Sequence, residues 1–290
     1  MRSFVVRQAV RLVAGVSGAV VAAAMISAIG EPRAHGLAPF LAAAVARLGH
    51  FAQGDFGLSA ISGLPVMDAL ASRMPPTILM VLAGAALALI AGIPLGLLFV
   101  VGPARRAAAP LVQIITATPV FCAGLALAYG AVHLLHWPVS VNMPVGAAVA
   151  PDQVLQIAAL PILTVGLAGA AAVQLALRRA AAQSSGEAFR AGLKRLGLGV
   201  FEVERAFILP QVLAGLVASA GEIMLALLSA AVVAEWVFHR PGAADLFVKS
   251  VALADWNVAA IVLFIFASLT FFAEFFGRIA GRILADEGRP

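Results

Sequence analysis

Long apolar runs separated by short polar stretches dominate the pattern of this chain. Six of these runs carry few charges, and each is long enough to cross about 30 Å of hydrocarbon as a helix. They lie at residues 11–29, 76–102, 109–135, 155–177, 209–234 and 257–280. The pattern predicts an all-α integral membrane protein with about six transmembrane helices.

Composition supports the same class. The mean hydropathy is +1.03 and only 11% of the residues are charged, whereas soluble domains carry roughly 25%. The first run, behind three arginines, also has the pattern of a signal peptide, but five further runs follow and favour an uncleaved anchor. The single cysteine, Cys122, lies within the third run, so an internal disulfide is excluded.

The basic residues are distributed unevenly between the two sides that the six runs define. Loops rich in Lys and Arg stay in the cytoplasm, and 14 of the 19 basic residues fall on the side that holds both termini. We therefore expect both termini in the cytoplasm. The basic charge then reflects topology and contact with anionic lipids, and no nucleic acid is expected as a partner. The other five are Arg33, Arg47, Arg73, Arg240 and Lys249.

The largest cytoplasmic loop, at residues 178–208, is the most polar stretch of the chain. Within it Phe189, Leu193, Leu196 and Val200 recur at helical spacing and form an apolar stripe. A glycine break at 197–199 ends this short helix, and a second charged turn leads to Pro210 at the start of the fifth run. An amphipathic helix lying on lipid would show the same stripe.

The spacing in this loop resembles a known signature. Gly197 lies thirteen residues before Pro210, which Leu209 precedes. This resembles the cytoplasmic signature of ABC-importer permeases, in which an EAA triplet is followed by a glycine and later by Leu-Pro. The triplet positions here hold Ala191, Gly192 and Leu193. The resemblance implies a coupling helix between helices four and five that docks on an ATPase through Phe189, Arg190, Leu193, Lys194, Leu196 and Gly197.

Further segments resemble one branch, the oligopeptide, dipeptide and nickel permeases, over roughly residues 50–275. They are GDFGLS (54–59), PVMDALASRMPPTILM (65–80), GIPLG (92–96), TPVF (118–121), HWP (136–138), LPILTVGL (160–167) and EWVFHRPG (235–242). The resemblance implies a type I ABC-importer permease fold. It divides the chain into an N-terminal anchor with an external amphipathic segment (1–75), a five-helix core (76–280) and a cytoplasmic tail (281–290). The core would include the coupling loop and an external hairpin at 235–256.

Some positions depart from the branch. The external segment after the first run is only about 24 residues long, and the hairpin has PGAA at 241–244 where a glycine usually ends it. Glu274 and Arg278 replace an amide and an acid. They are four residues apart with the acid first, the better orientation for a helical ion pair.

The resemblance also implies partners and a location. It implies a second homologous permease chain, one or two ABC ATPase subunits that hold ATP and Mg, and an extracytoplasmic solute-binding protein, in a bacterial inner membrane. Short peptides, nickel or metal chelates, and other small polar solutes such as opines are the cargo classes it allows.

The chain itself carries little catalytic chemistry. It has no GxxxxGK[ST] phosphate loop, so we expect no ATPase activity and no cofactor in this chain. His133 and His136 are three residues apart, but no third ligand lies near them in the sequence. We interpret them as interface histidines and expect no metal site.

Glu222 is the most informative residue within a run. A carboxylate inside a membrane costs about 2.5–3.5 kcal/mol on insertion scales and normally faces the bundle interior or a water-filled path. Helical spacing places Ser219, Glu222, Ala226 and Ser229 on one face, which we predict lines a translocation path. A protonated Glu222 in one interhelical hydrogen bond is the alternative.

Two predictions concern the outer side and the class of transport. We expect contacts to a binding protein from Asp55, Glu235, Trp236 and Arg240, with Trp236 as an interface anchor and Glu235 also able to gate the exit of the fifth run. An ATP-independent secondary transporter or channel that uses Glu222 as a proton or cation site is the alternative function. A purely structural membrane subunit is a further alternative. The two halves show no inverted repeat that would favour a secondary transporter.

Overall fold

The computed structural model describes residues 1–31, 36–101, 113–114, 116–137, 151–184, 199 and 203–287. In these residues the regular structure is helical, and an isolated antiparallel bridge joins Leu58 to Pro65. The expected all-α class is confirmed. The helices are α1 (Arg2–Ile29), α2 (Leu37–Ala52), α3 (Val66–Ala71), α4 (Met74–Val101), α6 (Val120–Leu134), α7 (Pro151–Ser184), the π-helical turn η1 (Glu204–Ile208), α10 (Leu209–Ala218), α11 (Ala220–Val237), α12 (Ala243–Ala252) and α13 (Trp256–Glu287).

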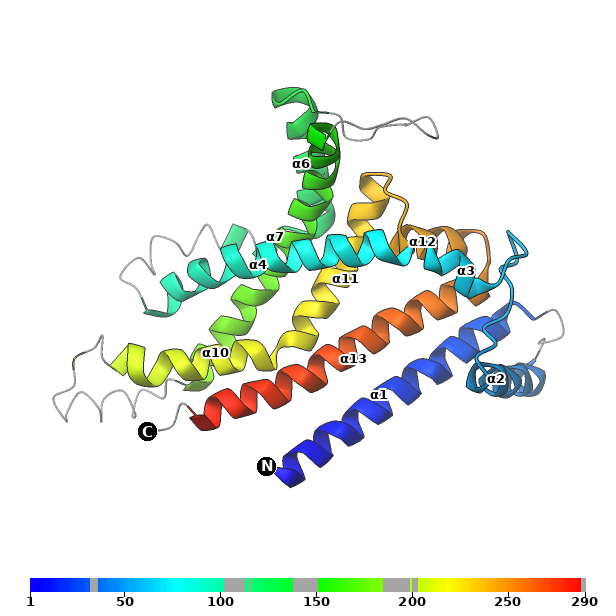
Figure 1. The fold of residues 1–290 in the computed structure, drawn as a ribbon, viewed down its shortest axis with the longest axis horizontal. Helices are drawn as coiled ribbons and strands as arrows, with labels where there is room; N and C mark the ends of the chain where they lie inside the picture. Colours follow the sequence, from blue (N-terminus) through cyan, green and yellow to red (C-terminus); the bar gives the residue numbers. More distant parts are fainter. Residues whose placement is uncertain are drawn as a thin grey trace.

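Five of these helices are long and apolar enough to cross a membrane, where the sequence predicted about six. Helix α6 has 15 residues and is therefore about 22 Å long. Helices α1 and α13 pack side by side in opposite directions, so the Arg2 end and the Glu287 end lie on the same side of the molecule (Figure 1).

The fifth predicted run is not one helix. The prediction of a single span over 209–234 is wrong, because the helix breaks at Ser219, and α10 meets α11 at an angle (Figure 1). The Ser219 hydroxyl donates a hydrogen bond to the Gly215 carbonyl oxygen at 3.0 Å. Such back-bonding bends helices. Helix α11 then continues to Val237, beyond the predicted end.

Close packing holds the break against α13. A Cβ on Gly277 would lie 2.5 Å from the Val217 carbonyl oxygen, and one on Gly281 would lie 2.6 Å from the Ala214 carbonyl oxygen. Small residues four apart allow two helices in a membrane to approach at backbone distance. The glycine pair therefore fixes α10 and the start of α11 against α13.

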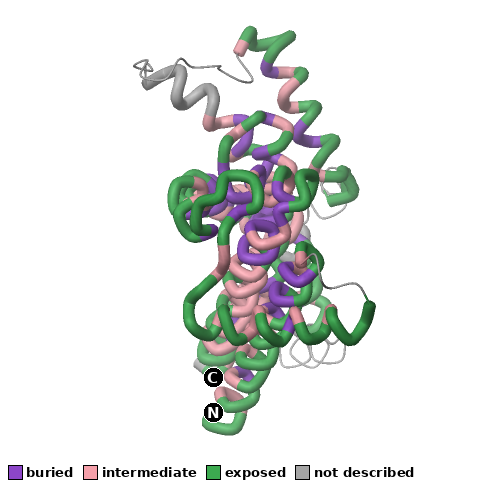
Figure 2. The backbone as a smooth tube through the Cα atoms, turned by 90° about the vertical axis from the view of Figure 1, so that its right-hand side faces the viewer, coloured by how far each residue is buried: buried purple, intermediate pink, exposed green. Residues whose placement is uncertain are grey.

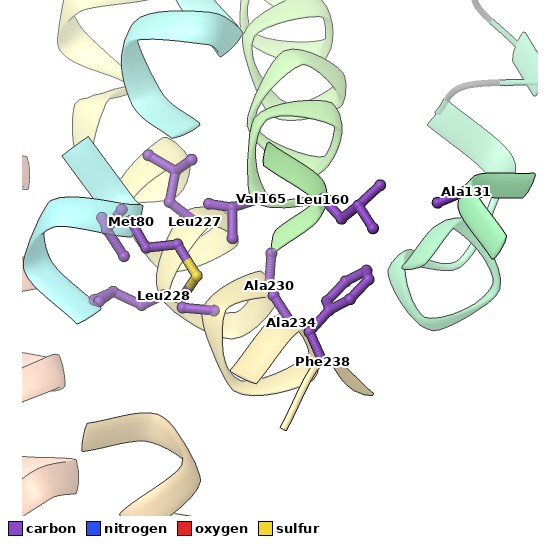
Figure 3. Close-up of a cluster of buried hydrophobic side chains, with 11 residues drawn as sticks. Met80, Ala131, Leu160, Val165, Leu227, Leu228, Ala230, Ala234 and Phe238 are labelled. Carbon is purple, nitrogen blue, oxygen red and sulfur yellow. The ribbon is translucent and has the colours of Figure 1, made fainter. Parts of the chain in front are cut away.

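The largest buried cluster lies where α4, α6, α7 and α11 meet (Figure 3). Met80, Val165, Leu227 and Phe238 are among its members. Figure 2 shows that the buried positions gather in the middle of the molecule, while exposed and half-buried positions prevail near both termini. This packed centre leaves one side of α11 exposed.

Candidate functional site

One face of α11 is open between its neighbours. Glu222, Leu225, Ser229 and Trp236 are exposed and recur at spacings of three, four and seven, which a helix of 3.6 residues per turn places on one side. Helix α7 packs on another side, where Leu227 fills the space above Gly169, and α13 approaches at Gly221. Leu225 and Ser229, in the middle of the stripe, stay exposed among the described residues.

A cavity of about 500 Å³ lies beside this stripe, between α11 and α13. Its walls are mostly apolar, with Leu225, Phe266 and Phe271 among them. Its polar side chains are Glu222, Ser229, Thr270 and Glu274. An apolar cavity with a few convergent polar groups is the usual form of a small-molecule site.

Both acids of the cavity are ion-paired. Arg179 of α7 donates through Nη1 to Glu222 Oε2, and both side chains are more than half exposed. Glu274 pairs within α13, where Arg278 Nη2 lies 2.8 Å from Glu274 Oε1, as their spacing predicted. The negative charge that the sequence places in this region is therefore compensated by two arginines.

The predicted path residues divide into two groups. Glu222 and Ser229 line the cavity, whereas Ser219 and Ala226 are half-buried beside it. Ser219 is the residue at which the helix breaks. The predicted ATPase-docking residues, Phe189 to Gly197, lie outside the described residues, so their helix stays a prediction.

The outer end of the open stripe carries an aromatic contact. The Trp236 ring, 55% exposed, lies 6.4 Å from the Phe121 ring of α6, centroid to centroid. Tryptophan favours the membrane interface because its ring is apolar and its N–H is polar. The stripe thus runs from an ion pair at one end to an aromatic pair at the other.

Glu235 does not lie where the sequence placed it. Its prediction as an external contact is wrong, because the residue is only 1% exposed. Glu235 Oε1 accepts a hydrogen bond from the Thr77 hydroxyl at 2.5 Å, and Oε2 accepts one from the Asp245 backbone N–H at 2.8 Å. The Ala243 N–H in turn donates to the Thr77 hydroxyl at 2.8 Å. The carboxylate therefore caps the first turn of α12, where a negative group is favoured, and ties α11 to α4.

Gly242 belongs to the same arrangement. A Cβ at this position would lie 2.1 Å from Glu235 Oε1 and 2.4 Å from Oε2. No real side chain fits at such a distance, so the carboxylate needs glycine here. The presence of both Glu235 and Gly242 in EWVFHRPG is therefore explained by their contact. Glu235 caps α12, and Gly242 leaves the space that the Glu235 carboxylate occupies.

The other two predicted external residues are accessible to different degrees. The Asp55 side chain is 60% exposed. The Gly57 N–H donates to Asp55 Oδ1 at 2.9 Å, and this bond, together with nearby His50, lowers the pKa of the Asp55 carboxyl. Arg240 is half-buried and lines a second cavity of about 390 Å³ together with Glu235 and Pro76.

Sequence reasoning missed two partners of these acids. Arg179 entered only the count of basic residues, and its pairing with Glu222 spans 43 positions. Thr77 and Glu235 are 158 positions apart. In the sequence, Thr77 stands out only as a lone hydroxyl near the start of an apolar run. Its partner, Glu235, becomes apparent only from the packing of α4 on α11.

Comparison with known proteins decides the family. The model of the family described as "Binding-protein-dependent transport system inner membrane component" matches residues 84–284. The chain belongs to this family. The permease is also 30% identical, over 217 residues, to the glutathione transport system permease protein GsiC of Escherichia coli strain K12 and to that of Shigella dysenteriae serotype 1. The match covers 73% of this chain and 68% of each relative.

The family match confirms the resemblance drawn from the sequence motifs. The chain is a permease subunit of a binding-protein-dependent ABC importer and a multi-pass inner-membrane protein. Members of this family are membrane permeases and are not themselves enzymes. ATPase and substrate-binding partners go with the family in general.

Proposed function

We propose that the permease forms half of the translocation pathway of an ATP-driven importer for short peptides or similar small polar solutes. The observation that carries the proposal is the open face of α11, where Glu222 and Ser229 line a cavity within a family of importer subunits. A second homologous permease chain would cover this face and complete the pathway. One or two ABC ATPase subunits and an extracytoplasmic solute-binding protein complete the assembly.

The cargo class rests on the relatives and on the charges of the cavity. Glutathione, which the name of the matched relatives gives as their cargo, is itself a short peptide, and this favours peptides over nickel, metal chelates or opines. Each acid of the cavity has an arginine beside it. Paired charges of both signs suit a zwitterionic solute better than a bare cation.

The proposed mechanism is alternating access. ATP binding draws the two ATPase subunits together, the cytoplasmic loop at 178–208 moves with them, and α10 transmits this movement to α11. Helix α10 begins at the π-helical turn η1 and ends at the break at Ser219, so it can tilt as a unit between two irregular points. The Arg179–Glu222 pair, which joins α7 to α11, is then the contact that such a tilt would change. Coupling needs only an element with two arrangements that the ATP state biases.

The secondary-transporter alternative receives no support from the site. A proton or cation site at Glu222 would require a carboxylate in need of a positive partner, and Arg179 already supplies one. The family match is also to a class of importers that depend on a binding protein.

The proposal is tested by affinity purification of the tagged permease from native membranes in mild detergent, with ATPase activity assayed in the purified fraction. Wild type should bring down an ATPase and a second permease chain. Phe189→Asp, which puts a charge into the predicted docking stripe, should lose the ATPase. Ala191→Glu is the matched control, because it adds the same charge on the opposite side of the predicted helix and supplies the acid at the first triplet position.

Recovery of the wild-type permease without any ATPase would contradict the proposal. Equal recovery of ATPase by wild type and Phe189→Asp would leave the importer function intact but would remove the predicted docking helix.

A further inference from the structure

Helix α2 lies across the end of α1 at a steep angle and does not extend it (Figure 1). It packs against α1, and Phe51 at its end joins the buried cluster around Val66, Leu70 and Val258. The helix is therefore a fixed part of the fold, at the end of the molecule opposite the termini. Because α1 has 28 residues and is about 42 Å long, longer than a hydrocarbon core of about 30 Å, this end falls at a membrane surface.

The polar and apolar faces of α2 are opposite to those of a helix that faces water. Arg47 is the only charged residue between Leu37 and Gly49, and it turns inward to pair with Glu31 while its guanidinium lies near Gly57. Between Leu37 and Gly49 the outward residues are all apolar, and the largest of them are well exposed: Leu37 is 76% and Val45 is 67% exposed. The remaining outward residues of this stretch are Ala38, Pro39, Leu41, Ala42, Ala46 and Gly49, and exposed His50 in the last turn pairs with Asp55.

Helix α12, another short helix at this end, has the arrangement of charges expected in water. On α12, Asp245 is buried and Lys249 reaches outward with 62% of its side chain exposed, joined to Asp245 at 2.6 Å. Thus α12 presents a charge to the surroundings, and α2 presents leucine and valine. The two helices face different media.

The end of α1 on which α2 packs carries an exposed apolar stripe. Val21, Met25 and Ile29 are exposed at steps of four on a helix that is apolar enough to cross a membrane. Exposed apolar residues on a spanning helix face acyl chains, and the next described helix begins with exposed Leu37. Exposed apolar residues of α1 and of α2 therefore meet at the same end of the molecule.

We propose that α2 lies in the membrane interface, with Leu37, Leu41 and Val45 inserted among the lipid acyl chains. Helices of this kind sit about 5–10 Å into the boundary between headgroups and acyl chains. The inward ion pair of Arg47 with Glu31 then ties α2 to the end of α1 at the membrane surface. The lipid bilayer, not the solute-binding protein, covers this face, and the proposal does not rest on the cargo or mechanism of transport.

Spin labelling of the full-length permease in liposomes of phosphatidylethanolamine and phosphatidylglycerol tests this directly. The Cys122→Ser background removes the only cysteine. Labels are then placed at Val45→Cys, at Lys249→Cys as the water-facing control, and at Phe276→Cys, which is 63% exposed on spanning helix α13, as the lipid-facing control. Relaxation by oxygen, which concentrates in lipid, is compared with relaxation by a water-soluble nickel chelate.

The proposal predicts that the ratio of oxygen to chelate relaxation at position 45 matches the ratio at 276 and exceeds that at 249 several-fold. A ratio at position 45 equal to that at 249 would overturn it. A label at 45 that is shielded from both reagents would also overturn it, because a protein surface, from a second copy or a partner, would then cover α2. The label at 276 separately reports whether the chain is inserted.

Discussion

Two glutamates on the same helix have opposite environments. Glu222, near the start of α11, is 64% exposed in its side chain and pairs with an arginine of α7. Glu235, thirteen residues later, is 1% exposed and is held by a hydroxyl and a backbone amide. Their positions in the sequence suggested the reverse, with Glu222 inside the membrane bundle and Glu235 exposed on the outer side. The difference teaches that exposure in a membrane bundle depends on which helices cover a face, and not on distance from the end of a run.

The largest expected effect is on stability, at the buried glutamate. Glu235→Ala leaves the Thr77 hydroxyl and the Asp245 N–H without their acceptor, and we expect the free energy of unfolding to fall by about 2–4 kcal/mol. Thermal unfolding in detergent measures the loss. Glu235→Gln, which keeps the shape and one acceptor oxygen, should lose less. Equal stability of Glu235→Ala and wild type would show that the cap does not hold α12 in place.

The second largest effect is expected at Gly242, which lies against the buried Glu235 carboxylate. Gly242→Ala should destabilise the permease by about 1–3 kcal/mol, because the new methyl group overlaps the Glu235 carboxylate. Gly49→Ala is the matched control: nothing lies within 4 Å of its Cβ position and it lies in a helix, so it should be neutral or slightly stabilising. Combining Gly242→Ala with Glu235→Ala should cost less than the sum of the two, since both act on one contact.

The third effect separates function from stability at the exposed glutamate. Glu222→Gln and Arg179→Gln should each change the free energy of unfolding by no more than about 1 kcal/mol, because both side chains are more than half exposed. Uptake of a labelled short-peptide mixture by cells that depend on this permease should fall in both. The exchanged pair, Glu222→Arg with Arg179→Glu, should recover part of the uptake. Unchanged uptake in both single variants would remove this contact from the transport cycle.

The smallest effect is expected at Asp55, the exposed acid outside the spans. The Gly57 N–H lowers the pKa of this carboxyl below its usual value of 3.8. A depressed pKa means that the stabilisation is complete above the unfolded-state pKa and is lost as the pH falls through the folded-state pKa. Wild type and Asp55→Asn should therefore differ slightly at neutral pH and converge below pH 3.8. Unfolding midpoints that stay apart at acid pH would contradict this.

The class of the protein and most of its helices could be predicted because hydrophobic run length reports directly on membrane crossing. The apolar runs predicted four of the five long helices as single helices, and the fifth, α11, is part of the run at 209–234 that breaks at Ser219. The i to i+4 pair of Glu274 with Arg278 was also predictable, since both residues lie on one helix. The break at Ser219 was not, because serine is tolerated inside helices. It depends on how closely α13 approaches through Gly277 and Gly281.

The site shows the same division between local and distant information. Helical spacing was enough to group Glu222 with Ser229 on one face. The burial of Glu235 depends on Thr77, 158 residues earlier, and on the start of α12. The sequence indicated α12 only as part of a hairpin. A single sequence carries no record of which distant residues meet, so the burial of this acid could not be predicted.

The central claim is that the open face of α11 lines the solute route, and the accessibility of Ser229 tests it most directly. In the Cys122→Ser background, Ser229→Cys is exposed to a charged, membrane-impermeant thiol reagent in the purified assembly, with and without ATP and vanadate, and Phe276→Cys serves as the lipid-facing reference. The account predicts that the cysteine at 229 reacts in at least one nucleotide state and that its rate differs between states. A cysteine at 229 as unreactive as that at 276 in every state would contradict it.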